Sequence, residues 1–360
     1  MKAVFRVDSS KIIGFGHLIR CLTLADALKE RGTESSFICR DHDGNIASKV
    51  LDKKYELFLL QKEKTIMPST EDKFQTNNWL GSSWNNDAED TKKILESLRP
   101  NWLIIDHYSI DVRWEREIAN LCDKLMVIDD MANRDHSCNL LLDQNYYLDM
   151  EERYKQKVPN ECMQLLGPKF ALLQPEFSRL RKKTQIRKLP IKNVMIFFGG
   201  SDNFNLTELT LQALEEYMEE LDSIDIVLPV DNENYENIKR LSLRNEKLNL
   251  YSDLPSLAPL MVKADLAIGA GGATNWERCC LGLPSLIILI ADNQKLTCTH
   301  LNQEKKIRLL GEAQNVDIDK LKGELENIFL DKNYSKWSKD VMSICSGDGA
   351  KLVADNIVSC

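Results

Sequence analysis

The sequence has no excess of basic residues. Its 47 lysines and arginines are outnumbered by 55 aspartates and glutamates, which leaves a net charge of −8. Non-specific binding to nucleic acid, or to an anionic membrane surface, depends on basic charge, so we expect neither as a partner. A phosphorylated substrate would need a locally positive site, because the overall field does not attract an anion.

Metal-binding cysteine motifs are missing as well. The chain has ten cysteines, yet it contains no CxxC pair and no Cys/His spacing typical of a zinc site. Asp129-Asp130 stands at the end of an expected strand and could be catalytic or bind a metal, but no third carboxylate or histidine completes a metal site with it. We therefore predict mostly buried, reduced thiols, and neither a metal nor another cofactor.

Long apolar runs are also absent. No stretch approaches the roughly 20 apolar residues of a membrane span. The N-terminus passes from Met1-Lys2 directly into an expected strand, without the apolar segment of a signal peptide. These features predict a cytoplasmic protein, and we expect it to be a monomer.

The chain does contain a regular alternation of short apolar runs and longer segments with helical periodicity. Strands are expected at residues 4–7, 34–39, 56–59, 102–106, 124–129, 139–142, 194–198, 225–228, 248–251, 265–269 and 285–289. The segments between them, such as 18–31, 88–98, 112–122, 275–281 and 294–309, are expected to be helical. This alternation predicts an α/β fold with parallel sheets covered by helices, whose ligands bind at the carboxyl ends of the strands.

The alternation stops at a basic, polar run and then restarts. We expect a Rossmann-like domain at 1–178, a solvated linker at 179–190 and a second Rossmann-like domain at 191–335, with the two sheets facing across a cleft. A helical segment at 336–360 is expected to pack back on the first domain. The polar segment 61–86 interrupts the first domain, and two interpretations stay open: a lid, or a surface loop held by Trp79 and Trp84.

A glycine-rich turn, Gly14-Phe15-Gly16-His17, joins the first expected strand to a helix, and Arg20 follows one helical turn later. Glycine allows a ligand to come close to the backbone, and the open N–H groups of a helix N-terminus favour an anion. Histidine exchanges a proton near neutral pH. Together these residues predict an enzyme site.

A second glycine-rich turn follows the strand at 265–269. We expect the backbone N–H groups of Gly271, Gly272, Ala273 and Thr274 to bind a diphosphate, with Glu277 on the hydroxyls of a ribose. Tight packing is the alternative role for these glycines. A shorter turn, Gly199-Gly200-Ser201, is expected to line the same cleft.

Polar residues follow several other expected strands. Tyr108 is expected near the substrate, whereas His107 is more simply explained by local backbone contacts. The amides of Asn293 and Gln294 suit sugar hydroxyls, because an amide both donates and accepts hydrogen bonds. Asp143-Gln144-Asn145 either helps to shape the cleft or simply makes a turn.

Several motifs, in one order along nearly the whole chain, carry a resemblance to a known family. They are Phe5-Arg6-Val7-Asp8-Ser9-Ser10, Gly14-Phe15-Gly16-His17 with Arg20, Ile105-Asp106-His107-Tyr108, Ile128-Asp129-Asp130, Leu142-Asp143-Gln144-Asn145, and Gly269-Ala270-Gly271-Gly272 with Trp276-Glu277-Arg278. With them the chain resembles the UDP-2,4-diacetamido-2,4,6-trideoxy-β-L-altropyranose hydrolases of pseudaminic acid biosynthesis, the PseG family. Its second half also resembles that of MurG.

The resemblance implies a GT-B fold and metal-independent hydrolysis of a UDP-sugar at its anomeric carbon, with inversion. The free sugar would feed the synthesis of pseudaminic acid, which decorates flagellin or surface polysaccharide. His17, Tyr108 and Asn293 match catalytic positions. The residues expected to bind the sugar or UDP are Gly14, Gly16, Arg20, Gln174, Gly199, Gly200, Gly271, Gly272, Ala273, Thr274, Glu277 and Gln294.

One position departs from the family pattern. Gln174 stands where the resemblance leads us to expect an arginine, so it can only hydrogen-bond, and its role and the sugar specificity stay open. Two other functions stay open as well: a glycosyltransferase that uses the same UDP site, and a nucleotide-sugar sensor without catalysis.

Overall fold

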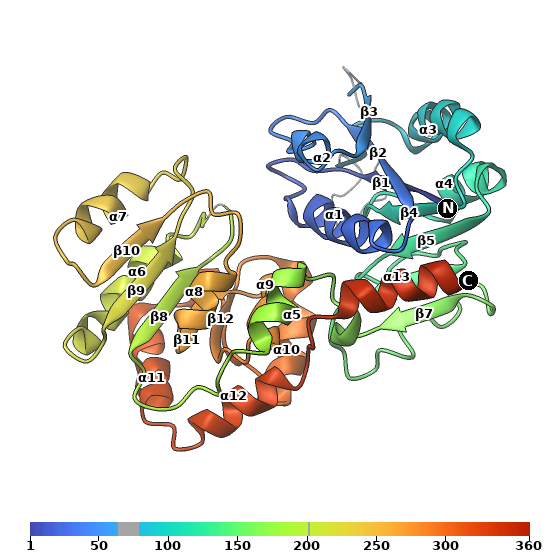
Figure 1. Cartoon of the computed structure of the whole chain (residues 1–360). Helices are drawn as coiled ribbons and strands as arrows, with labels where there is room; N and C mark the ends of the chain where they lie inside the picture. Colours follow the sequence, from blue (N-terminus) through green and yellow to red (C-terminus); the bar gives the residue numbers. More distant parts are fainter. Residues whose placement is uncertain (64–78, 201) are drawn as a thin grey trace. The chain divides into compact units, whose positions relative to one another are not determined.

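The computed structural model describes residues 1–63, 79–200 and 202–360, and these form two compact units (Figure 1). The first unit consists of residues 1–145, 149–172 and 348–360, and the second of residues 146–148 and 173–347. The chain therefore passes from the first unit into the main part of the second between Leu172 and Leu173, a few residues before the expected domain boundary at 178.

The first unit is built on a seven-stranded parallel sheet with the order β3-β2-β1-β4-β5-β6-β7. Its strands are β1 (Lys2–Val7), β2 (Glu34–Arg40), β3 (Glu56–Leu60), β4 (Trp102–Asp106), β5 (Lys124–Ile128), β6 (Leu140–Asp143) and β7 (Met163–Leu166). Its helices are α1 (Gly16–Lys29), α2 (Ser48–Asp52), α3 (Trp84–Leu98), α4 (Val112–Ile118) and α13 (Gly349–Ser359).

Side chains of β1 alternate between two cores, as the pleat of a strand requires. Phe5 and Val7 enter the core that α1 and α13 cover, and Val4 enters the core under α3 and α4. Helix α13 lies beside α1 (Figure 1), where Asp355 accepts a hydrogen bond from Arg31 Nε at 2.6 Å. Residues 348–360 thus complete the first unit.

The second unit has a six-stranded parallel sheet with the order β10-β9-β8-β11-β12-β13. Its strands are β8 (Asn193–Phe197), β9 (Ser223–Val227), β10 (Leu248–Tyr251), β11 (Leu266–Ala270), β12 (Ser285–Leu289) and β13 (Arg308–Glu312). Its helices are α5 (Pro175–Arg181), α6 (Leu206–Leu214), α7 (Tyr235–Ser242), α8 (Ala258–Lys263), α9 (Thr274–Cys280), α10 (Lys295–Gln303), α11 (Ile318–Phe329) and α12 (Tyr334–Met342). Both sheets place the unit's first strand beside its fourth, the arrangement of a Rossmann fold.

The structure corrects several expectations about individual elements. Strands β7 and β13 were not expected, and the helix expected over 294–309 is wrong at its end, because α10 stops at Gln303 and β13 begins at Arg308. The run 179–190 is not solvated throughout: Arg187 is buried and donates to the backbone carbonyls of Met261 and Ala264. Within 61–86, helix α3 begins at Trp84, and residues 64–78 lie outside the described residues.

The C-terminal segment divides between the two units. Helix α12 belongs to the second unit, and only residues 348–360 belong to the first. All ten cysteines are free thiols, and eight of them are buried, as the sequence predicts. In the parts of the chain that the structure describes, no helix has the length and apolar character to cross a bilayer.

Candidate functional site

The turn before α1 places His17 at the first turn of the helix. Gly14 has a φ of +86°, a conformation that side chains other than glycine rarely adopt, and its N–H bonds to the Ser10 carbonyl at 2.9 Å. Gly16 opens the helix, and a methyl group there would meet no atom within 4 Å. His17 and Arg20 lie three residues apart and therefore share one face of α1.

Asp106, at the end of the neighbouring strand β4, receives both of these side chains. The His17 Nδ1 atom lies 2.6 Å from Asp106 Oδ1. Arg20 donates to the same carboxylate from Nε, at 2.6 Å from Oδ2, and from Nη2, at 2.6 Å from Oδ1. Burial is the largest single influence and would raise the pKa of Asp106, but the charge of Arg20, together with the contact to His17 and the hydrogen bonds from both side chains, outweighs it and holds that pKa well below its usual value.

This contact fixes which nitrogen of His17 carries the proton. An ionised carboxylate only accepts hydrogen bonds, so Nδ1 donates to Asp106 in this short contact. Arg20 Nη2 lies 3.2 Å from the same nitrogen, but it is also a donor and does not bond to it in this tautomer. In the neutral ring Nε2 then keeps its lone pair, and the side chain is 11% exposed. A histidine oriented in this way by a carboxylate can take a proton from a water molecule or a hydroxyl group.

Tyr108 forms a second hydrogen-bonded pair beside His17. Its hydroxyl donates to Asp130 Oδ1 at 2.6 Å, and its ring meets the His17 ring edge-on, with the centroids 4.7 Å apart. Arg20 Nη1 lies 3.4 Å from Asp130 Oδ2, so one guanidinium bridges both carboxylates. Burial, and then the charge of Asp130, raises the pKa of Tyr108 well above its usual value, so the residue remains a neutral phenol.

His107 belongs to a different hydrogen-bond network, which includes the local backbone contact expected from the sequence. Its Nε2 lies 3.2 Å from Asp8 Oδ2, and its Nδ1 accepts from the Ser109 N–H at 3.1 Å. Asp8 also pairs with Arg6, which reaches Asp87 on α3. Burial lowers the pKa of His107, which favours the neutral ring.

Asp129 and its neighbours are held by side chains of the first unit. Arg134 lies 2.8 Å from Asp129 Oδ1, and the Tyr154 hydroxyl lies 3.0 Å from both Asp129 Oδ2 and Asp143 Oδ2. Burial, followed by the charge of Asp130, raises the pKa of Asp143 to about 8. Among the described residues, no group of three His, Cys, Asp or Glu side chains has the arrangement of a metal site.

The glycine-rich turn of the second unit follows β11 and serves packing as well. A methyl group on Gly269 would come within 2.2 Å of the Phe197 carbonyl oxygen, and one on Gly271 within 2.4 Å of Cys298 Sγ. One on Gly272 would approach an atom only at 3.9 Å. Tight packing therefore accounts for Gly269 and Gly271, but not for Gly272.

Two side chains to which the sequence motifs assign no role, Arg278 and Asn275, set the orientation of this turn. Arg278 Nη2 donates to the Ala270 carbonyl at 2.7 Å, and Asn275 Nδ2 donates to the Gly271 carbonyl at 2.9 Å. In a trans peptide the N–H points opposite to the carbonyl, so the N–H groups of Gly271 and Gly272 point away from these two side chains. The Gly271 N–H instead bonds to Gln294 Oε1 at 3.2 Å.

Glu277 lies on α9, one turn after this loop. Its side chain is half-buried, and Oε2 is shielded from solvent without a hydrogen-bond partner among the described residues. Burial raises its pKa to about 7. A shielded carboxylate oxygen without a partner is costly, which suits a residue whose partner is a ligand hydroxyl.

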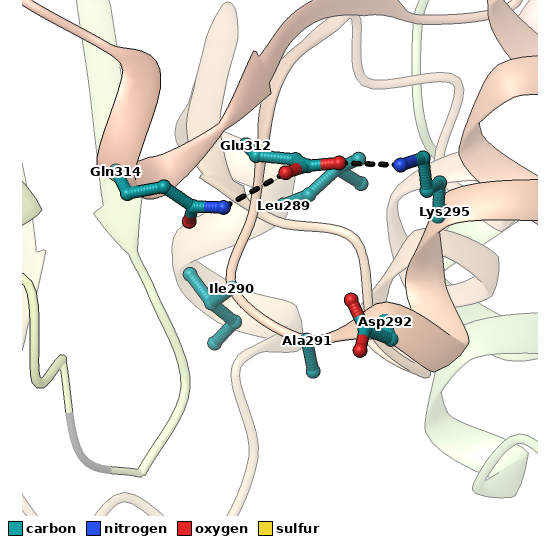
Figure 2. Close-up of a pocket in the computed structure, with 7 residues that line it drawn as sticks. All are labelled: Leu289, Ile290, Ala291, Asp292, Lys295, Glu312 and Gln314. Atoms are coloured by element: carbon teal, nitrogen blue, oxygen red, sulfur yellow. Dashed lines mark hydrogen bonds and ion pairs between the residues drawn. The ribbon is translucent and has the colours of Figure 1, made fainter. Parts of the chain in front are cut away.

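Asn293 and Gln294 lie on the short turn between β12 and α10. Asn293 is exposed, whereas Gln294 is half-buried and also accepts from the Ile290 N–H at 3.2 Å. Figure 2 shows a pocket of about 60 Å³ beside this turn. It is lined by Leu289, Ile290, Ala291, Asp292, Lys295, Glu312 and Gln314. The Lys295 ammonium lies 2.5 Å from Glu312 Oε1, so its charge is already paired.

The remaining expected residues lie at turns of the second unit. Gly199 has a φ of +90°, and a methyl group there would lie 3.9 Å from Ile290 Cδ1, while Gly200 faces open space. Ala273 immediately precedes α9, and Thr274 is its first residue. Gln174 immediately precedes α5 and is half-buried.

The structure thus gathers His17, Arg20 and Tyr108 in the first unit, and Gly271 and Gln294 in the second. The sequence motifs do not predict that Asp106 pairs with His17 or that Asp130 pairs with Tyr108. A signal for them was present, because each stands at or just after the end of an expected strand close to the first strand of the sheet.

Comparison with known proteins agrees with this architecture. Residues 194–356 match the glycosyltransferase family 28 C-terminal domain. The structure resembles that of MurG from Acinetobacter baumannii with a TM-score of 0.68 at 11% identity, covering 100% of both chains. It also resembles UDP-GlcNAc 2-epimerase from Neisseria meningitidis with a TM-score of 0.60 at 10% identity, again over 100% of both chains.

Two relatives extend over most of the sequence. The UDP-2,4-diacetamido-2,4,6-trideoxy-beta-L-altropyranose hydrolase of Campylobacter jejuni is 28% identical over 84% of this chain and 96% of its own length. An uncharacterized protein of Methanocaldococcus jannaschii is 25% identical over 98% of this chain and 72% of its own length. The expected resemblance is confirmed: the chain is an α/β protein of the GT-B fold, it is similar to this hydrolase along most of its length, and its residues 194–356 match the model of the glycosyltransferase family 28 C-terminal domain.

Proposed function

We propose that the chain hydrolyses a UDP-sugar at its anomeric carbon, and that the sugar is 2,4-diacetamido-2,4,6-trideoxy-β-L-altropyranose. The observation that carries this proposal is the pairing of His17 Nδ1 with Asp106, which leaves Nε2 as a base. The similarity to the Campylobacter jejuni hydrolase supports the choice of substrate.

In this mechanism His17 Nε2 takes a proton from water, and the water oxygen bonds to the anomeric carbon. The bond from that carbon to the diphosphate oxygen breaks, and its electron pair leaves with UDP. Attack opposite the leaving group inverts the configuration. Asp106 stabilises the imidazolium that forms, while Tyr108, held by Asp130, positions the water or the sugar as a neutral phenol.

The second unit would supply the contacts to UDP. The N–H groups of Gly271, Gly272, Ala273 and Thr274 suit the diphosphate, and Glu277 suits the ribose. Gly199 and Gly200 would allow close approach of the ligand, Asn293 and Gln294 would bind the sugar, and Asn293 would be a third catalytic residue. Because the Gly271 N–H is bonded to Gln294, the glutamine must release it when the diphosphate binds.

A glycosyltransferase is the second candidate, since the family 28 domain and the likeness to MurG favour it. Release of UDP from the purified protein, with the diacetamido-trideoxy UDP-sugar, EDTA and no acceptor, tests the choice. We expect stoichiometric UDP and free sugar. Binding without release would favour the transferase instead, and release that stops in EDTA would contradict a metal-independent mechanism.

His17→Phe is expected to retain UDP binding and to lower kcat by at least about 100-fold, because the general base is lost. The control is His300→Phe, since His300 contacts the Leu148 N–H and the Tyr147 ring outside both groups of candidate residues. Near-normal turnover of His17→Phe would remove His17 from the mechanism.

A further inference from the structure

Trp79 extends the aromatic surface beside His17. Its ring lies against Tyr108, with centroids 5.6 Å apart and an interplanar angle of 33°. The ring of Tyr108 in turn packs nearly perpendicular to the ring of His17, with the centroids 4.7 Å apart. Three rings from three distant parts of the sequence therefore adjoin one another at the proposed base.

The residues after Trp79 fix its position. Leu80, Gly81 and Ser82 are buried, and Gly81 has a φ of +67°. A methyl group on Gly81 would come within 2.6 Å of His42 Cε1, so the chain passes here in close contact with the interior. The Gly81 carbonyl accepts from the Glu63 N–H at 3.0 Å, and the Ser82 hydroxyl donates to Glu63 at 2.7 Å.

Among the described residues, Trp84, the other tryptophan of this segment, contacts the hydrophobic core and not the candidate site. Trp84 packs against the core under α3 and α4, and the Arg113 guanidinium lies 5.4 Å from its ring. Both tryptophans are half-buried, but the aromatic contact of Trp79 is with Tyr108, a residue of the candidate site. The two tryptophans therefore differ in what they touch, although only four residues separate them.

We propose that Trp79 contacts the substrate and receives the apolar side of the sugar. This inference rests on the proposed function, because the sugar named there lacks a 6-hydroxyl group and carries two acetamido groups. Its methyl groups present apolar surface that an indole can cover. A sugar with a 6-hydroxyl group would bury that hydroxyl against the ring without a partner, which is unfavourable. Trp79 would thus select 6-deoxy, N-acetylated sugars and exclude water beside His17.

The first test compares Trp79→Ala and Trp79→Phe with wild type on the diacetamido-trideoxy UDP-sugar and on UDP-N-acetylglucosamine, which has a 6-hydroxyl group. We expect Trp79→Ala to lower kcat/KM for the 6-deoxy substrate by about ten-fold or more, and to reduce the preference over the other sugar. Trp79→Phe should keep most of the kcat/KM for the 6-deoxy substrate and most of the preference for it. Inhibition by UDP should be unchanged in both variants. Trp84→Phe is the matched control and should keep the preference.

Equal losses on both sugars in Trp79→Ala, or no loss on either, would overturn the inference. A second measurement separates it from the proposed function: the tryptophan fluorescence of the protein is followed while free 2,4-diacetamido-2,4,6-trideoxy-L-altrose is added. We expect the fluorescence of wild type and of Trp84→Phe to change as the sugar is added, and that of Trp79→Phe to stay constant. A change that persists in Trp79→Phe, or no change in wild type, would reject the role of Trp79, whereas failure of wild type to release UDP would reject the hydrolase alone.

Discussion

At the scale of single residues, one carboxylate governs the proposed base. Asp106 accepts hydrogen bonds from both His17 and Arg20, and the arginine keeps it ionised. The histidine therefore depends on a partner 89 residues away for its tautomer. An asparagine at this position can donate from its amide nitrogen, which would allow the opposite tautomer.

We predict that Asp106→Asn lowers kcat by at least about 100-fold while UDP binding is retained. Steady-state kinetics gives the first quantity, and titration calorimetry with UDP gives the second. Asp111→Asn is the control, because Asp111 caps α4 and pairs with Arg113 at the surface. If Asp106→Asn kept wild-type turnover, the Asp106 contact would have no role in catalysis.

Asp143 gives a prediction about pH. Burial raises its pKa in the folded state to about 8, whereas a carboxyl group in an unfolded chain titrates near 4. Its contribution to stability is therefore fully present below about pH 4 and is lost as pH rises toward 8, because only the unfolded state releases the proton in that window.

Asp143→Asn removes this titration. The free energy of unfolding of the variant, relative to wild type, should therefore increase between pH 5 and pH 8, and denaturant titrations at the two values measure it. Asp149→Asn is the control, because Asp149 lies exposed in a turn, and its difference from wild type should not change between the two pH values. A difference that does not change with pH would mean that Asp143 is ionised in the folded protein.

At the scale of elements, the glycine-rich turn after β11 combines packing with an open backbone. Gly271→Ala would push a methyl group against Cys298 on α10, and we expect it to lower the free energy of unfolding by about 1–3 kcal/mol. Gly272→Ala, in the same turn, has room and should unfold like wild type. Thermal or denaturant melting distinguishes the two variants, and equal stability would contradict the assigned contact.

The sequence predicts most of the strands because their apolar runs are continuous and buried on both faces. Strands β7 and β13 escape this signal, since each lies at the edge of its sheet and exposes part of its length. The end of α10 is missed because helical spacing continues toward Leu309, while tertiary pairing with β12 draws the chain into β13.

The candidate site is predicted only in its locally encoded part. His17, Arg20 and the glycines can be found from turn motifs. The pairing of His17 with Asp106 and of Tyr108 with Asp130 depends on which strands become neighbours, and the contact of Gly271 with Gln294 spans 23 residues. Such contacts have no short-range pattern in the sequence.

At the scale of the whole molecule, residues 173–347 of the second unit separate α13 from the rest of the first unit along the sequence. Ile357 and Val353 are completely buried in the core under α1. We predict that Ile357→Ala destabilises the protein by about 2–4 kcal/mol, and that hydrogen exchange rises in the first unit but not in the second. Val358→Ala, at a position 44% exposed, is the control. Equal changes in both units would show that they unfold together.

This arrangement also has a consequence for synthesis on the ribosome. The strands of the first unit are translated first, but Val353 and Ile357 of their core emerge only after the second unit is complete. Part of the apolar face of the first unit's sheet therefore stays uncovered until α13 has been synthesised. The second unit does not depend on α13 and can complete its core earlier. During translation the second unit can reach its final packing before the first.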